Sequence, residues 1–266
     1  PDEREMTKAG RQQTEIFPLA LFATGGMMAF TSAMDLLTLF IALEVLSLPL
    51  YVLSATARRK RLLAQEAALK YFILGAFSSA IFLMGAALFY GATGTLNLTG
   101  AFLRAEFGPA GDFSVMLAVA GIMMLVGLLF KVGAVPFHSW TPDVYQGAPT
   151  PITGFMAAGT KAAAFLAMAR VFYWVAVLVH DSLNVFLWIV IIATILVGTV
   201  MGLIQTDIKR LLAYSSIAHA GFILIAINAI NNPEGSVQVT EQSIAAIMFY
   251  LLAYGIGTVG AFGIVT

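Results

Sequence analysis

The chain has 266 residues, of which 60% are hydrophobic and 11% are charged. A soluble domain has about 45–50% apolar and about 25% charged residues, so this composition excludes a water-soluble enzyme and a disordered chain. Fourteen basic residues balance fourteen acidic ones, which argues against a nucleic-acid partner. The absence of cysteine excludes disulfides, thiolate zinc sites and cysteine-bound iron–sulfur clusters within this chain.

About eight segments are apolar enough to cross a bilayer, because about 20 apolar residues span roughly 30 Å of hydrocarbon as a helix. They lack the alternation of a barrel strand, and a helix satisfies its own backbone hydrogen bonds in lipid. The sequence therefore predicts an all-α fold, a polytopic transmembrane helical bundle. The expected spans are residues 16–33, 34–57, 66–91, 113–135, 150–178, 183–204, 209–230 and 243–265.

The loop lysines and arginines predict an orientation for this bundle. Nine of them fall on one face when the spans are counted alternately, and only Arg104 falls on the other. Because basic loops remain in the cytoplasm, we expect the Arg58–Arg61 connection to be cytoplasmic. The polar residues 1–15 do not resemble a signal peptide, and they are expected on the same side.

Glu44 lies near the middle of the second expected span, ahead of Pro49. Ionisable side chains deep in a membrane are costly, and they usually line a cavity or a pathway. Since proline has no amide hydrogen, the Val45 carbonyl loses its helical partner, and we expect a kink or a water site beside the carboxylate. The alternative is a neutral or statically paired carboxyl that fixes helix packing.

Lys131 is followed by Gly133 and Pro136, a combination that predicts a broken helix in the fourth span. Interrupted spans are tolerated where they line a cavity, and the negative end of a half-helix favours a cation. These features predict a functional lysine at the break. The alternative is a lysine that extends its ammonium to the membrane surface.

Lys161 lies about eleven residues into the fifth span, which at 1.5 Å per residue is roughly 16 Å along the helix. This position is close to the bilayer centre, too deep for the ammonium to reach the surface easily. Small neighbours, including Gly159, leave room for other helices and for water. We therefore expect a functional amine.

His219 lies in the middle of the seventh span and shares a helix face with Ser215 and Ser216. Histidine titrates near neutrality, which suits a proton relay. A hydrogen-bonded core histidine is an equally good interpretation of the sequence, so both remain open.

Glu66 and Lys70 are one helical turn apart at the start of the third span, and they predict an interfacial ion pair. The alternative is that Lys70 supplies protons to a route through the membrane.

Two glycine patterns are expected to permit close helix packing: Gly198 with Gly202, and the run from Gly255 to Gly260. The second spells a dinucleotide fingerprint, but no strand precedes it. His138 and His180 are expected in loops between spans, and no metal site is predicted.

Two buried lysines and a glutamate together suggest a proton relay. An unpaired buried ammonium readily loses its proton. A carboxylate at about 6 Å, with an effective dielectric constant of about 20, stabilises the protonated amine by roughly 2.8 kcal/mol. Separating Glu44 from Lys131 would therefore release a proton, which Lys161 could accept through water.

Several motifs resemble one family closely: the antiporter-like membrane subunits of respiratory complex I, and among them the N type. The L and M types and the Mrp-type cation/proton antiporters share the same plan. The motif from Pro136 to Pro151, PFHSWTPDVYQGAPTP, is highly specific. The carrying segments are residues 40–51 with Glu44, EAALKYF at 66–72, FKVGAVPFHSWTPDVYQGAPTPI at 130–152, KAAAF at 161–165 and KRLLAYSSIAHAG at 209–221.

The resemblance implies a fold of two inverted five-helix repeats, in which broken helices face a hydrated axis. It divides the chain into a polar segment at residues 1–15, a first repeat at 16–180 and an incomplete second repeat at 181–266. The whole chain would then be the central portion of a longer subunit. The family's proton-path residues map onto Glu44, Lys131 and Lys161. By the same resemblance His219 lies beside the route. Lys70 remains a possible member on its position alone, as a lysine that could supply protons to the route.

The function implied by the resemblance is proton translocation in an NADH:quinone oxidoreductase. NADH, FMN, iron–sulfur clusters and quinone would bind elsewhere in the complex, and no cofactor is expected in this chain. The expected partners are adjacent antiporter-like subunits, lipid and protons, in a bacterial cytoplasmic membrane. The alternatives are a subunit of an Mrp-type cation/proton antiporter and a structural scaffold with static buried charges.

Overall fold

The computed structural model describes the chain in five ranges, residues 15–57, 61–101, 114–175, 180–230 and 237–265. Within them the chain is helical, apart from short connections and an isolated antiparallel bridge between Asp35 and Asn97. The all-α class predicted from the sequence is confirmed. The helices are α2 (Ile16–Ser32), α3 (Leu36–Ser54), α4 (Arg61–Thr93), α6 (Ser114–Val132), α7 (Trp140–Gly147), α8 (Thr150–Phe155), the π-helical turn η1 (Met156–Thr160), α9 (Lys161–Val175), α10 (His180–Leu203), α11 (Ile208–Ile230) and α12 (Val237–Val265).

Seven helical segments of the described chain are long and apolar enough to cross a membrane. They are α3, α4, α6, α10, α11, α12 and the run of α8, η1 and α9 over residues 150–174. Helix α2 is also apolar but has 17 residues. These seven segments and α2 match the predicted spans, and the chain is a multi-pass membrane protein.

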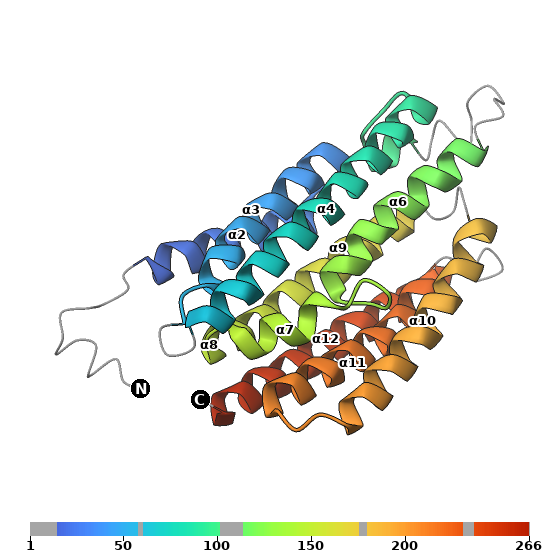
Figure 1. Ribbon diagram of the computed structural model, residues 1–266. Coiled ribbons are helices and arrows are strands. Elements are labelled where there is room, and N and C mark those ends of the chain that lie inside the picture. Colours follow the sequence, from blue (N-terminus) through green and yellow to red (C-terminus); the bar gives the residue numbers. More distant parts are fainter. Residues whose placement is uncertain (1–14, 58–60, 102–113, 176–179, 231–236, 266) are drawn as a thin grey trace.

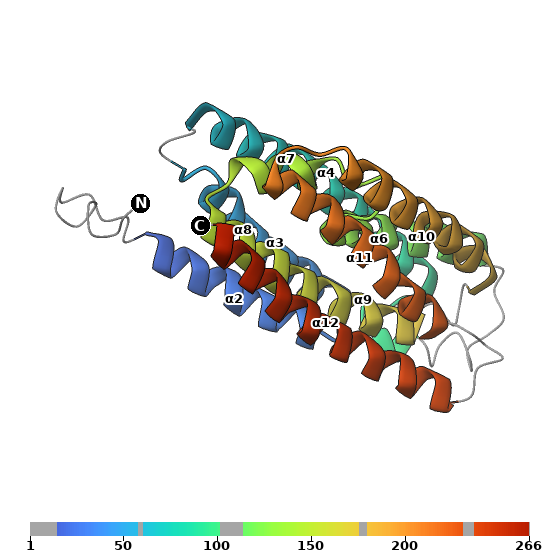
Figure 2. The same ribbon diagram turned by 90° about the horizontal axis from the view of Figure 1, so that it is seen from below.

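The helices form an elongated bundle (Figure 1). Helices α2, α3 and α4 lie on one side, α10 and α11 lie on the other, and α6 to α9 run between them. In Figure 2, α12 and α2 lie along one face, and α4 and α10 lie along the opposite face. Close packing joins α2 to α3, α4 to α6 and α10 to α11, and the short helix α7 packs against both α4 and α11.

The predicted break after Lys131 is present. Helix α6 ends at Val132, and the chain turns through residues 133–139 before α7 begins at Trp140 (Figure 1). Gly133 has φ +74°, a left-handed conformation that glycine adopts without a steric penalty. A Cβ atom at this position would lie 2.7 Å from Thr141 Oγ1, so both the backbone angle and the space require glycine.

The backbone groups released by this break find partners within the bundle. Trp140 Nε1 donates to the Phe130 carbonyl at 2.9 Å, which fixes the start of α7 against the last turn of α6. The Val135 amide donates to Thr194 Oγ1 of α10 at 3.0 Å. Because buried backbone groups cost free energy when unpaired, these bonds allow a helix to stop in an apolar interior.

Helix α3 begins at a strong cap and continues through its proline. The Asp35 carboxylate accepts hydrogen bonds from the amides of Leu37 and Thr38, at 2.9 and 3.0 Å. The helix then runs unbroken to Ser54 with Pro49 inside it. Glu44 therefore projects from a continuous helix, without an interruption of the helical structure at Pro49.

The glycine predictions have different outcomes. A Cβ atom at Gly198 would lie 2.5 Å from the Ala218 amide nitrogen, so α10 and α11 pack closely there as predicted. The glycines of α12 do not pack in this way against the described part of the chain. A Cβ atom at Gly257 or Gly260 would meet nothing within 4 Å, and one at Gly255 would have its nearest contact at 3.9 Å.

Candidate functional site

Both candidate lysines lie inside the bundle. Lys131 is 5% exposed and Lys161 is 4% exposed. Each lies where regular α-helix is interrupted: Lys131 in the last turn of α6, and Lys161 directly after the π-helical turn η1. Such π-helical turns are frequent at functional sites. The burial of Lys131, with its amine hydrogen-bonded to a serine of α3, contradicts the alternative in which this side chain extends to the membrane surface.

Lys131 donates a hydrogen bond to Ser47 Oγ of α3 at 2.6 Å. The Ser47 hydroxyl in turn donates to the Leu43 carbonyl one turn earlier. Because its own hydrogen is engaged there, the serine oxygen is oriented to accept from the lysine. Ser47 therefore holds the amine against α3.

Glu44 lies one helical turn before Ser47 and interacts electrostatically with Lys131. The hydrogen bond of Lys131 goes to Ser47 rather than to the carboxylate. No described residue donates a hydrogen bond to Glu44 Oε1. The two charges thus influence each other without direct contact, and a small movement of either side chain would change their interaction.

Aromatic rings enclose Lys131 on its other sides. Its Nζ lies 5.8 Å from the centroid of the Tyr51 ring and 5.5 Å from that of Tyr71. Tyr71 stacks on Trp140 of α7 with ring centroids 4.6 Å apart. Cation–π contacts favour the ammonium by about 2 kcal/mol or more when water is excluded. The rings therefore stabilise the charged lysine and connect it to the break.

Lys161 has the same kinds of neighbour. It donates hydrogen bonds to both the carbonyl and the hydroxyl oxygen of Ser216 in α11. Its Nζ lies 5.5 Å from the ring centroid of Tyr254 in α12. Tyr145 of α7 also reaches Ser216, with 3.5 Å between the two hydroxyl oxygens. Ser216 thus joins helices α7, α9 and α11 around the amine.

His219 lies one turn beyond Ser216 and is half-buried. Its Nδ1 is 2.6 Å from the hydroxyl of Tyr250 in α12. His219 and Tyr250 also line a cavity of about 470 Å³ between α11 and α12. The structure therefore brings His219 to the same side of the bundle as Lys161, and it gives the ring a hydrogen-bond partner.

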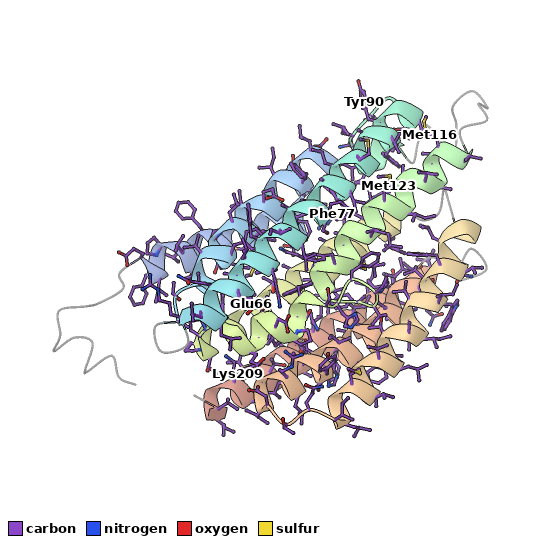
Figure 3. The ribbon with its side chains drawn as sticks, in the orientation of Figure 1. Glu66, Phe77, Tyr90, Met116, Met123 and Lys209 are labelled. Carbon is purple, nitrogen blue, oxygen red and sulfur yellow. The ribbon has the colours of Figure 1, made fainter. Side chains whose placement is uncertain are left out.

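Lys70 belongs to a separate cluster at one end of the bundle. The predicted ion pair with Glu66 is present at 2.7 Å, and Lys70 also binds Asp143 of α7 at 2.9 Å. Arg210 of α11 binds the other oxygen of Asp143 at 2.8 Å. Figure 3 shows Glu66 and Lys209 at this end, and Tyr90 and Met116 at the opposite end. Lys70 is 45% exposed, so it does not join the buried lysines.

Asp143 is the centre of this surface cluster. Burial acts to raise the pKa of Asp143, but the hydrogen bonds and charges of Lys70 and Arg210 outweigh burial and hold that pKa below its usual value. The carboxylate therefore stays charged near neutrality, where it connects α7 to both α4 and α11.

Sequence reasoning missed several neighbours that complete the site. Ser47 could have been found from its spacing, since it lies three residues after Glu44 on one helix face. Tyr250 and Tyr254 had no signal of their own, because tyrosines are common in apolar helices and only the packing of α12 on α11 brings them to His219 and Lys161. Asp143 lies inside the specific motif, but its partners come from distant segments.

The described part of the chain contains no group of three or more histidine, aspartate or glutamate side chains placed to hold a metal ion. His138 lies in the turn before α7, and His180 is the first residue of α10. The chemistry that the arrangement offers is proton binding at amines, an imidazole and hydroxyls.

Comparison with known proteins agrees with this geometry. The family described as NADH:quinone oxidoreductase/Mrp antiporter, TM matches residues 33–266. The NADH-quinone oxidoreductase subunit N of Beutenbergia cavernae is 57% identical over 99% of this chain. That match covers 48% of the relative, so the chain spans about half the length of the curated relatives it matches.

Solved structures resemble the chain in the same way. A chain of respiratory complex I from Thermus thermophilus is 43% identical with a TM-score of 0.78, covering 95% of this chain and 51% of that one. A chain of the Mrp complex from Dietzia is 27% identical with a TM-score of 0.76, covering 92% and 43% respectively. The chain belongs to the NADH:quinone oxidoreductase/Mrp antiporter family of transmembrane proteins.

Proposed function

We propose that this chain translocates protons in the membrane arm of an NADH:quinone oxidoreductase, through a relay that includes Glu44, Lys131, Lys161 and His219. The observation that carries the proposal is the pair of lysines, each buried beyond 90%, at the two interrupted segments of the bundle. An isolated charge in such surroundings is expensive. Proton transfer through the bundle would account for two such buried charges.

Lys131 would hold a proton while Glu44 is near. With an effective dielectric constant of about 20, a shift of the carboxylate from about 6 Å to about 10 Å removes about 1 kcal/mol of attraction. That change lowers the affinity of the amine for its proton about sixfold. The Ser47 oxygen keeps the amine in place while the charge balance changes.

Energy for this movement would come from quinone reduction in other subunits, which would bind NADH, FMN, iron–sulfur clusters and quinone. The partners of this chain would be adjacent antiporter-like subunits, together with lipid and protons. We place it in a bacterial cytoplasmic membrane, with the Arg58–Arg61 connection, of which residues 58–60 lie outside the described ranges, on the cytoplasmic side. The division into repeats at residues 16–180 and 181–266 belongs to the same proposal.

The second candidate is a subunit of an Mrp-type cation/proton antiporter, favoured by the likeness to the Dietzia structure. The higher identity to subunit N of an NADH-quinone oxidoreductase supports the first candidate. Purification separates the two: the first predicts co-purification with NADH-oxidising subunits, and the second predicts co-purification with antiporter subunits alone.

Lys161→Met in the complete complex tests the function directly. Methionine keeps the length of the side chain but cannot bind a proton, so we expect protons pumped per NADH oxidised to fall severalfold. The measurement is acidification of inverted vesicles at matched rates of NADH oxidation. Arg61→Gln, at the exposed start of α4, serves as the charge-removing control and should pump normally. Intact pumping by Lys161→Met would support a scaffold instead.

A further inference from the structure

Helix α12 presents two tyrosines to the functional site, although most of its surface is open. Only Ser243, Ile247, Leu251 and Phe262 of its described side chains are buried. Tyr250 and Tyr254 are one helical turn apart, so they share the face that packs on α11. Both tyrosines therefore lie on the side of α12 that faces Ser216 and His219 of α11.

The first of these hydroxyls lies next to the lysine. The Tyr254 side chain lies close to Ser216 and to Thr258 of its own helix, and it interacts electrostatically with both. Ser216 accepts the hydrogen bonds of Lys161, and the Tyr254 ring lies over the same amine. The Ser216 side chain therefore neighbours both the Lys161 amine and Tyr254.

The second hydroxyl lies next to the imidazole. The ring of His219 has its centroid 5.1 Å from that of Tyr254 and 5.9 Å from that of Tyr250. Its Nδ1 is hydrogen-bonded to the Tyr250 hydroxyl. This contact orients the imidazole ring, and the Tyr250 hydroxyl can donate to Nδ1 or accept from it, according to which nitrogen carries the hydrogen.

A cavity lies along both tyrosines. Its volume is about 470 Å³, and its lining combines the polar side chains of Ser215, His219, Tyr250, Tyr254 and Thr258 with the apolar ones of Leu212, Ala253, Ala261 and Phe262. This space is large enough for several water molecules, because one water needs about 10–15 Å³ of such space. The polar groups of the lining supply the hydrogen-bond partners that a water molecule in such a space requires.

We propose that Tyr254 passes protons between Lys161 and this cavity, and that Tyr250 is a positioning residue that orients His219 to receive them. The proposal rests on the proton-translocating function proposed above. In each transfer the Tyr254 oxygen accepts one proton from the side of Lys161 and releases its own proton toward His219. The phenol ends neutral, Lys161 loses one positive charge and the acceptor gains it.

Tyr254→Phe in the complete complex tests the transfer step. The ring and its contact with Lys161 remain, but the hydroxyl is lost, so we expect the rate of proton pumping to fall by about tenfold or more. Tyr173→Phe is the matched control, because Tyr173 of α9 is 44% exposed and touches neither amine nor cavity. If Tyr254→Phe pumps like the parent while Lys161→Met does not, the role of Tyr254 is wrong and the proposed function stands.

Tyr250 is tested by a double-mutant cycle with His219. Tyr250→Phe and His219→Gln should each reduce the number of protons pumped per NADH. The double variant should pump no less than His219→Gln alone, because either change already breaks the hydrogen-bonded pair of His219 and Tyr250. The complex content of the membranes is measured in parallel on native gels. Additive losses in the ratio, or a loss of assembled complex that accounts for the decrease, would overturn the positioning role.

Discussion

Each buried lysine is held by a serine hydroxyl and the face of a tyrosine. Lys131 has Ser47 with Tyr51 and Tyr71, and Lys161 has Ser216 with Tyr254. A hydroxyl accepts a hydrogen bond from an ammonium and from a neutral amine alike, since both carry N–H donors. This environment therefore tolerates both protonation states, which a direct ion pair with a carboxylate would not.

At this scale the account predicts a clear effect of Ser47→Ala. Lys131 would lose its acceptor, and a hydrogen bond to a charged group is worth about 1.5–3 kcal/mol. Proton pumping in the complete complex should therefore slow by about tenfold, measured as vesicle acidification. Ser54→Ala is the control: Ser54 is buried in the same helix and donates to the Leu50 carbonyl in the same way, but its other partner is Met156 Sδ rather than Lys131. Equal effects of the two variants would contradict a specific role for Ser47.

At the scale of the elements, the interruptions in the helices matter most. The break after α6 follows Lys131 in the last turn of that helix, and η1 precedes the other lysine at the start of α9. The first was predictable because Gly133 and Pro136 are strong local signals. The second was not, because Met156–Thr160 contains ordinary helix-compatible residues and its widened turn depends on packing.

Gly133→Ala tests the break. Alanine at φ +74° is strained by about 1–2 kcal/mol, and its Cβ would also collide with Thr141 Oγ1. We expect a lower thermal stability of the complex and reduced pumping, because Lys131 lies two residues away. Gly25→Ala in α2 is the control, since a Cβ there meets nothing within 4 Å and alanine favours a helix, so it should lower neither quantity. Parent-like stability of Gly133→Ala would disprove the strain argument.

The Asp143 cluster gives a pH-dependent prediction. Its pKa is held below the usual value of about 3.9, so its contribution to stability is full above that pH and is lost as the pH falls through the lowered pKa. Asp143→Asn should destabilise the complex by about 1 kcal/mol, because partly exposed ion pairs contribute little. Thermal unfolding should show a constant difference from the parent between about pH 5 and 8, and a smaller one below about pH 4. A difference that vanishes near neutrality would contradict the lowered pKa.

At the scale of the whole molecule, composition and span length were sufficient for the fold class. The predicted spans correspond to α2 and seven longer helical segments because lipid leaves a chain little choice of structure. The burial of Lys161 followed from its depth along the span, and that of Lys131 from the break signalled by Gly133 and Pro136. Their partners did not, since Ser216 and Tyr254 come from helices that meet Lys161 only in the folded bundle.

The central claim is that the buried lysines gain and lose protons, and Lys161→Arg in the complete complex tests it most directly. Arginine keeps the positive charge and can still donate to Ser216, but it does not release its proton in proteins. The measurement is the number of protons pumped per NADH oxidised, in complexes whose assembly is verified on native gels. The account predicts that this ratio falls as far as in Lys161→Met. A ratio equal to that of the parent would mean that only a fixed charge is needed, and would contradict the relay.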